Sequence, residues 1–373
     1  MRHLRYGGSS AKRTIGCPGW LKKSKNIPRR PAGQAAIDGS MHHEIMEMCQ
    51  RDLTMPEDNL GFVYKENGVK REFTEDDLDL SYIAYNAINQ LLDELDIDEM
   101  MIEPFVQMVA GQAGGSIDLL GLSEDRKTLL IADYKFGTIK VSPTENEQGG
   151  VYGVSVMRDK TTANFFTDVE KVVFAIVQPK VKGVVFTWET DVEWLLDFEQ
   201  KFLAAMASDK INPGSHCKWC PAEPYCEEKR LNIVASSLLG ARDKDDLQAA
   251  ANVLVEVEDW LKSMKEELYL QLSRGVPLQG WKIVDKRATR KWVDEIAVAD
   301  ALEAVKLDAL MYKEPTLLTP PQMEKLVKKN KVEIDLDEFI MSTSSGTTLA
   351  LADDSRDAVI VSDVQGHLAD IME

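Results

Sequence analysis

The chain has 373 residues, 44% of them hydrophobic, which suffices for one large domain or two domains with buried cores. No apolar run approaches the roughly 18 residues of a membrane span, and the N-terminus lacks the apolar core of a signal peptide, which argues against a membrane partner and predicts a cytoplasmic protein. Five cysteines in so long a chain favour metal ligation in a reducing compartment over a disulfide framework.

The charge is unevenly distributed. The formal net charge is −18, yet residues 1–37 contain nine Lys or Arg and no acid. An acidic body with a basic N-terminal arm can contact a phosphate backbone locally, although a basic tail can also be merely solvated.

A basic arm, rich in Gly, Ser and Pro, covers residues 1–32, and residues 33–230 alternate between helical and strand patterns. This mixture predicts an α/β core with a mixed sheet flanked by helices. Helices are predicted over 35–52, 74–95, 145–158 and 190–208, and strands over 103–110, 115–123, 128–136, 171–179 and 183–189.

The C-terminal third has a helical texture, so residues 231–341 are predicted to form a mainly helical extension. Leucines recur every seven residues from Leu247 to Leu268, which predicts a long helix that ends before Gly275. Residues 342–373 are predicted to form a linker and an acidic tail.

The strongest catalytic signal lies in "GGSIDLLGLSEDRKTLLIADYKFG", which reads as a β-hairpin. Side chains alternate along a strand, so Asp133 and Lys135 share a face, and Asp118 can meet them at one end. Two adjacent carboxylates suit a hard divalent cation such as Mg²⁺, and Lys135 could then orient or deprotonate a water and neutralise charge on a phosphate. A plain salt bridge is the alternative.

Two further pairs lie near this hairpin in the sequence. His43 and Glu47 are four residues apart on a predicted helix, and adjacent His42 leaves the choice of ligand open. Gln148 and Tyr152 share a helical face just after the hairpin, and both side chains can hydrogen-bond a phosphate or a base edge.

In this order, G-S-x-x-H-x3-E, G-x-I-D, D-Y-K and Q-x3-Y resemble the motifs of the PD-(D/E)XK nuclease superfamily in its RecB-like branch. The resemblance covers roughly residues 10–230 and implies a restriction-endonuclease-like core. The residues that it implies as metal ligands are His43, Asp118, Asp133 and the backbone carbonyl of Tyr134. Lys135 would be the catalytic lysine, Gln148 and Tyr152 would contact DNA, and Glu103 would be an additional acid.

The segment "SHCKWCPAEPYC" places Cys217, Cys220 and Cys226 in C-x2-C-x5-C spacing, one ligand short of a tetrahedral site. The layout resembles the AddB-type iron–sulfur branch of the same superfamily, which implies a [4Fe-4S] cluster completed by Cys17. Four thiolates also suit structural Zn²⁺, for which His216 is an alternative ligand. Cys49 is expected to be a buried core thiol.

The resemblance as a whole implies a Mg²⁺- or Mn²⁺-dependent DNA exonuclease that leaves 5′-phosphates, and a phage or prophage origin with a role in recombination or replication of phage DNA ends. An annealing protein, a single-strand-binding protein or a helicase would be its partner. A structure-selective endonuclease and a non-catalytic DNA-binding or assembly protein are the alternatives.

Overall fold

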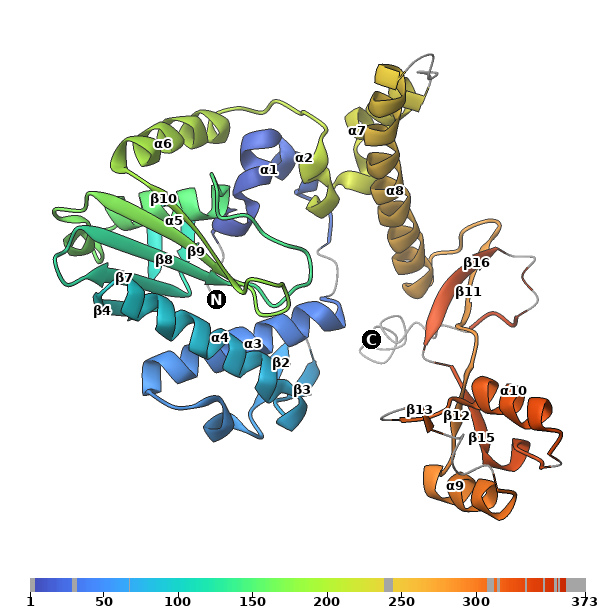
Figure 1. Ribbon diagram of the computed structural model, residues 1–373. Helices are drawn as coiled ribbons and strands as arrows, with labels where there is room; N and C mark the ends of the chain where they lie inside the picture. Colours follow the sequence, from blue (N-terminus) through green and yellow to red (C-terminus); the bar gives the residue numbers. More distant parts are fainter. Residues whose placement is uncertain are drawn as a thin grey trace, which may run out of the picture. The chain divides into compact units, whose positions relative to one another are not determined.

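The computed structural model describes residues 4–28, 32–66, 68–237, 244–306, 312–313, 316–332, 334–344, 346–351, 354 and 356–359 (Figure 1). The chain divides into two units, Met1–Val257 and Glu258–Glu373. Within the described residues, no helix is both long enough and apolar enough to cross a membrane.

A mixed sheet of five strands lies at the centre of the first unit, in the order β10-β9-β8-β7-β4. Strands β8 and β9 pair in parallel, and the other neighbours are antiparallel. The strands are β4 (Ile97–Ile102), β7 (Leu119–Ser123), β8 (Thr128–Tyr134), β9 (Lys171–Val177) and β10 (Val185–Thr190).

Helices cover both faces of this sheet, and the strand sequences explain why (Figure 1). Strand β8 is buried along nearly its whole length, as expected for a strand with cores on both sides. Leu129 and Ile131 pack into a core with α5 (Glu147–Arg158) and α6 (Val192–Met206). Leu130 and Ala132 pack into the opposite core with α3 (Gln34–Asp52) and α4 (Glu75–Glu94). The predicted α/β core, a mixed sheet flanked by helices, is confirmed.

A second sheet has three strands in the order β1-β6-β5. It joins the central sheet through two short crossings, from β4 to β5 and from β6 to β7. The remaining elements of this unit up to residue 226 are β1 (Tyr6–Gly7), α1 (Ala11–Gly16), α2 (Trp20–Ser24), β2 (Val63–Glu66), β3 (Val69–Glu72), β5 (Phe105–Val109), β6 (Ala113–Ser116) and the short 3-10 turns Gly8–Ser10, Pro56–Asn59, Ala163–Phe166, Ser215–Trp219 and Glu223–Tyr225.

The rest of the chain contains α7 (Glu227–Ser237) and α8 (Lys244–Ser273), which crosses the division between the units. In α8, Leu254 is 62% and Leu261 44% exposed. The leucine pattern therefore predicts the helix correctly, but these two leucines are not buried in a core. The second unit also contains α9 (Glu295–Ala304), α10 (Pro320–Asn330), β11 (Trp281–Asp285), β12 (Thr289–Trp292), β13 (Tyr312–Lys313), β14 (Thr316–Leu317), β15 (Ile340–Thr343) and β16 (Thr347–Leu351).

The C-terminal region was expected to be a mainly helical extension followed by a linker, but the second unit also contains paired strands. Strand β11 pairs with β16, and β12 pairs with β15, so residues expected as a linker contribute to two strand pairs. The Ser- and Thr-rich composition of 342–348 hid these strands, because their pairing partners lie about sixty residues earlier in the chain. The tail from residue 360 onward lies outside the described residues.

Candidate active site

The predicted hairpin brings Asp118, Asp133 and Lys135 to one end of the central sheet. Asp118 precedes β7, and its Oδ2 accepts a hydrogen bond of 2.7 Å from the backbone N–H of Tyr134. Asp133 lies near the end of β8, and one of its carboxylate oxygens forms an ion pair with the Lys135 ammonium. The two acids and the lysine are therefore held by the register of one hairpin, with the Tyr134 ring buried on the opposite face in the α3–α4 core.

Glu103 joins them from the neighbouring crossing. It lies between β4 and β5, and its backbone N–H donates to the Asp118 carbonyl over 3.1 Å. Its φ is +52°, in the left-handed region that a residue with a side chain rarely adopts. Strain of this kind concentrates at functional sites, which favours a role for this acid.

The charges of these groups are unequal. Burial and, after it, the neighbouring Asp118 charge together raise the pKa of Glu103 to about 7. Burial also opposes ionisation of Asp118, but the contact with His43, the Lys135 charge and the Tyr134 N–H together outweigh it and hold the pKa of Asp118 below its usual value. The proton shared by this pair therefore resides on Glu103.

In the Asp133–Lys135 pair, Asp133 is buried and Lys135 is partly exposed. Burial raises the pKa of Asp133, although the Lys135 charge opposes that effect. Burial lowers the pKa of Lys135, but the charges of Asp133 and Asp118 together outweigh it and the pKa ends above its usual value. Lys135 is thus a cation at neutral pH while Asp133 is its partner, so it could act as a general base only after that contact is released.

The structure distinguishes the two adjacent histidines of α3. His43 points to the site, with Nδ1 3.3 Å from Asp118 Oδ2. His42 points away from it and is 3% exposed. Burial lowers the pKa of His42 to about 4, so this ring is neutral at pH 7.

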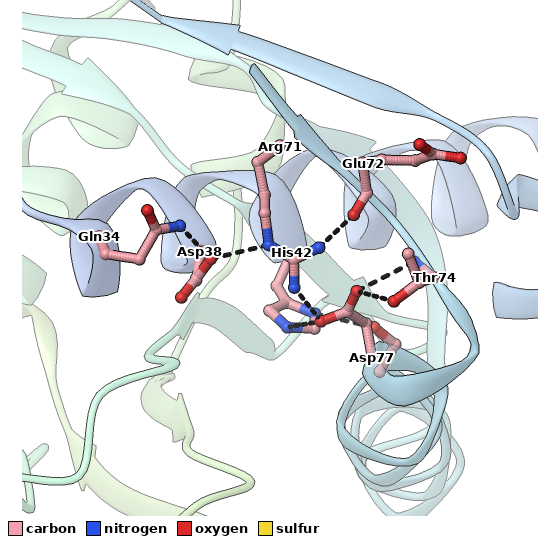
Figure 2. A network of polar contacts seen from close by, with 8 residues as sticks. Gln34, Asp38, His42, Arg71, Glu72, Thr74 and Asp77 are labelled. Carbon is pink, nitrogen blue, oxygen red and sulfur yellow. Dashed lines mark hydrogen bonds and ion pairs between the residues drawn. The ribbon is translucent and has the colours of Figure 1, made fainter. Parts of the chain in front are cut away.

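His42 belongs to a polar network that joins α3, β3 and α4 (Figure 2). Its Nδ1 lies 3.0 Å from Ser81 Oγ, and its Nε2 lies 3.9 Å from Asp77. Arg71 in turn bridges Asp77 and Asp38, with contacts of 2.6 and 3.0 Å.

Phe136 links this network to the site. His42 stacks on its ring at 4.8 Å, and His43 meets the same ring edge-on at 5.5 Å. Because both rings contact Phe136, the network behind α3 supports the orientation of His43.

Glu47 lies on the His43 side of α3 and forms an ion pair with Arg51. Its charge contributes to the raised pKa of Glu103, so it is near the acids without contacting Asp118 or Asp133 in any described hydrogen bond.

Gln148 and Tyr152 on α5 complete the constellation. The Gln148 amide donates to Asp133 Oδ1 over 2.7 Å and to the Tyr152 hydroxyl over 3.2 Å. Tyr152 is 8% exposed, so its hydroxyl lies inside the site and not on the outer surface. The pair expected to contact DNA is here held against an active-site carboxylate.

The donor set suits a divalent cation. Nδ1 of His43 and Oδ2 of Asp133 are buried polar atoms whose contacts are with charged groups, the first with Asp118 Oδ2 at 3.3 Å and the second with the Lys135 ammonium. As they stand, no three His, Cys, Asp or Glu side chains of the described ranges are arranged to hold a metal ion. Binding would therefore require Lys135 to release Asp133 and protons to leave both His43 and Glu103.

A separate pocket gathers cysteines from both ends of the first unit. Cys17, Cys217, Cys220 and Cys226 all line it, so the N-terminal cysteine lies with the three of the later cluster. Burial raises the pKa of each thiol, that of Cys217 to about 11.

Two of the four sulfurs accept a backbone N–H, and a backbone N–H lowers the pKa of each of the other two thiols. The donor to Cys17 is Asn212 and the donor to Cys217 is Gly214, both at 3.4 Å, and Ala222 and Lys229 serve Cys220 and Cys226. Hydrogen bonds of this kind stabilise thiolates, so the chemistry of the four donors suits a metal held by cysteine sulfurs, and the side chains would have to turn toward one another to bind it.

His216 has a structural role in this pocket. Its Nε2 lies 2.9 Å from the Asn212 carbonyl oxygen, so that nitrogen carries the proton. The His216 ring also packs directly on the backbone of Gly16. If residue 16 carried a side chain, its Cβ atom would lie only 2.5 Å from Nδ1 of His216. His216 thus holds the loop before Cys217 against the segment before Cys17, and Cys17 is the better fourth ligand.

Arg13 is the residue that sequence reasoning missed. It lines the cysteine pocket, one helical turn before Cys17. The R-x3-C spacing on a helix was the available signal, since residues four apart share a face. The buried thiol Cys49 packs in a small core with Met41 and Ile45, away from this pocket, as expected.

Comparison with known proteins gives two results. A family model described as a protein of unknown function, DUF2800, matches residues 3–357. One similar solved structure is LHK-Exo in complex with dAMP, and another is the alkaline exonuclease LHK-Exo from Laribacter hongkongensis. Each is 13% identical with a TM-score of 0.24, over 62% of this chain and 98% of that chain. With similarity this low, we base the functional proposal on the chain's own residues.

Proposed function

We propose that this chain, which belongs to the DUF2800 family, is a metal-dependent nuclease that hydrolyses phosphodiester bonds. The convergence of Asp118, Asp133 and Lys135 at one buried hairpin end carries the proposal. A salt bridge alone needs one acid and one lysine. It does not account for the second acid, the strained Glu103 or the His43 contact to Asp118.

In this proposal His43, Asp118, Asp133 and the Tyr134 carbonyl hold Mg²⁺ or Mn²⁺, with Glu103 as an additional acid. The ion would supply Lewis acidity and lower the pKa of an attacking water. Lys135, once released from Asp133, orients that water and neutralises charge that develops on the phosphate. Gln148, which also bonds the Tyr152 hydroxyl, holds Asp133, and this pair would contact the nucleic acid where it enters the site.

We further propose that the substrate is DNA and that the products carry 5′-phosphates, as the motif order implies. Processing of phage DNA ends would be one use. Linear and covalently closed circular DNA separate the exonuclease from a structure-selective endonuclease, because only an exonuclease requires an end.

The test is digestion of end-labelled DNA with Mg²⁺ or Mn²⁺ by the wild type and Asp133→Asn. We expect the wild type to cleave, and Asp133→Asn to be at least ~10²-fold slower because it loses a metal ligand and the partner of Lys135. Glu170→Gln is the matched control, since Glu170 is an exposed acid paired with Lys127 at the other end of β8.

If the wild type binds DNA but does not cleave it, the proposed nuclease function is rejected in favour of a non-catalytic DNA-binding protein. Undiminished cleavage by Asp133→Asn would reject the site.

For the cysteine pocket we propose a structural [4Fe-4S] cluster, with Zn²⁺ as the alternative. The pocket's four thiols and its N–H donors support a four-sulfur metal centre but do not distinguish the two. A brown chromophore in an anaerobic preparation, with iron and sulfide in the protein, is the expected result, and a colourless protein with one bound zinc would select the alternative.

A further inference from the structure

We infer that Arg13 is the positioning residue and counter-charge of the four-cysteine site. The inference rests on the proposal that Cys17, Cys217, Cys220 and Cys226 bind a metal, and it adds a residue that holds one ligand in place and balances the charge of the bound centre.

The position of Arg13 is fixed on two sides. Its guanidinium carbon lies 4.0 Å from the centre of the Trp20 ring, a cation–π contact. The Trp20 indole N–H donates to Thr14 Oγ1 over 3.1 Å, which holds that ring in turn. The backbone N–H of Cys17 bonds the Arg13 carbonyl over 2.8 Å, so the arginine and the first cysteine belong to one turn of α1.

From this position Arg13 reaches the other end of the unit. Its Nη1 donates to the carbonyl oxygen of Trp219, the residue before Cys220. The Trp219 side chain is 72% exposed, so the backbone and not the indole is what anchors this turn. Arg13 therefore ties the segment between Cys217 and Cys220 to the helix that carries Cys17.

The charges around the pocket point the same way. Lys23 pairs with Glu228 at 3.0 Å, and Lys229 pairs with Glu256 at 2.5 Å. Arg13, by contrast, has no carboxylate within ion-pair distance among the described residues, and its Nε is buried without a hydrogen bond. A cation in this setting is costly unless an anion faces it. A metal bound by four thiolates carries net negative charge and would supply that anion.

The test measures metal affinity of the full chain, with Zn²⁺ titrated against a chromophoric chelator under reducing conditions. Arg13→Gln removes the charge and the contact to Trp219, and Arg13→Lys keeps the charge. We expect Arg13→Gln to bind Zn²⁺ ~10- to 100-fold more weakly, as for other residues that support metal ligands, and Arg13→Lys to be intermediate.

Arg158→Gln is the control, because Arg158 is in an ion pair with Glu199 and does not line the pocket. Its affinity should equal that of the wild type. Thermal unfolding of the metal-free variants checks that Arg13→Gln is folded. Co²⁺ spectra add a specific readout, since a displaced Cys220 reduces the thiolate-to-cobalt absorption from the four-thiolate level toward the three-thiolate level.

Wild-type affinity in Arg13→Gln, or a loss of the same size in Arg158→Gln, would overturn the inference. If a Cys217→Ser variant binds Zn²⁺ as tightly as the wild type, the cysteine site itself is rejected. This outcome is distinct from the Arg13 result, because the Arg13 variants keep all four cysteines.

Discussion

Glu103 and Asp118 show how neighbouring carboxyls divide their roles before any metal is bound. Asp118 is ionised because His43 faces it and the Tyr134 N–H bonds it, whereas Glu103 keeps a proton because it is buried beside that charge. A divalent ion would compete with the Glu103 proton, so metal affinity should rise with pH up to about 7, the pKa of Glu103.

Glu103 should make the metal-free protein lose stability as pH rises. The pKa of Glu103 in the folded protein, about 7, exceeds the ordinary value of 4.5. Its contribution to the free energy of unfolding is therefore complete below pH 4.5 and is lost as the pH rises through 7. We expect thermal unfolding in a chelator, between pH 5 and 8, to show a decline in the wild type that is shallower in Glu103→Gln.

Glu99→Gln is the control for this series, because Glu99 is a partly exposed acid of β4 paired with Arg126. Its pH profile should follow the wild type. Parallel profiles for the wild type and Glu103→Gln would show that Glu103 has no raised pKa.

At the scale of elements, α3 carries two adjacent histidines with different tasks. Helix periodicity places consecutive residues about 100° apart but does not say which faces the sheet. Packing of α3 against α4 and β3 decides it: the Arg71–Asp77–Ser81 side takes His42, and the hairpin side takes His43.

His42 should make the fold acid-sensitive. The pKa of His42 in the folded protein, about 4, lies below the ordinary value of 6.5. Its contribution to the free energy of unfolding is therefore present above pH 6.5 and is lost as the pH falls through 4. A shift of this size corresponds to about 3 kcal/mol. We expect urea unfolding to show that the stability gap between wild type and His42→Gln narrows from pH 7 to pH 4.

Ser81→Ala is the companion variant, since it removes the Ser81 hydroxyl and leaves the buried ring. It should keep the acid sensitivity of the wild type. A constant gap between wild type and His42→Gln would contradict the role of His42.

The elements of the central domain were predictable where local pattern and burial agree. Strands β8 and β9 are short apolar runs because both faces are covered, and α4 begins at Thr74, whose side chain bonds Asp77 in a capping box. Strand β4, "IDEMMI", was missed because only its pairing with β7 makes it a strand. The C-terminal strand pairs were missed for the same reason.

The candidate site was predictable to the extent that one hairpin carries it. The spacing of Asp133 and Lys135 gives their common face, and the hairpin register gives Asp118. The contact of Gln148 with Asp133 and the strain at Glu103 could not be predicted, because both depend on how α5 and the β4–β5 crossing meet the sheet.

At the scale of the whole molecule, the cysteine pocket joins the two ends of the first unit. A metal held by Cys17 and Cys226 closes a loop of about two hundred residues, and closing long loops removes much chain entropy, ~5 kcal/mol in the loop-closure model. The proposed centre would therefore stabilise the first unit from a distance, away from the hairpin where we propose that hydrolysis takes place.

Loss of this centre should destabilise the domain. We expect Cys217→Ser to lose the metal and to unfold on the order of 10 °C lower, as measured by metal analysis and calorimetry. Cys49→Ala is the matched cysteine control and should retain the metal, because Cys49 packs in another core. A Cys217→Ser variant with full metal content and unchanged unfolding temperature would refute the stabilising role of the proposed centre.

The central claim is that the hairpin acids and Lys135 hydrolyse phosphodiester bonds with a divalent ion. The most direct measurement is nucleotide release from end-labelled linear DNA by chelator-treated protein before and after Mg²⁺ is restored, for wild type, Lys135→Ala and the control Lys127→Ala. We predict release only with Mg²⁺, unchanged in Lys127→Ala and at least ~10²-fold slower in Lys135→Ala. Release without a divalent ion, or at the wild-type rate by Lys135→Ala, would contradict the claim.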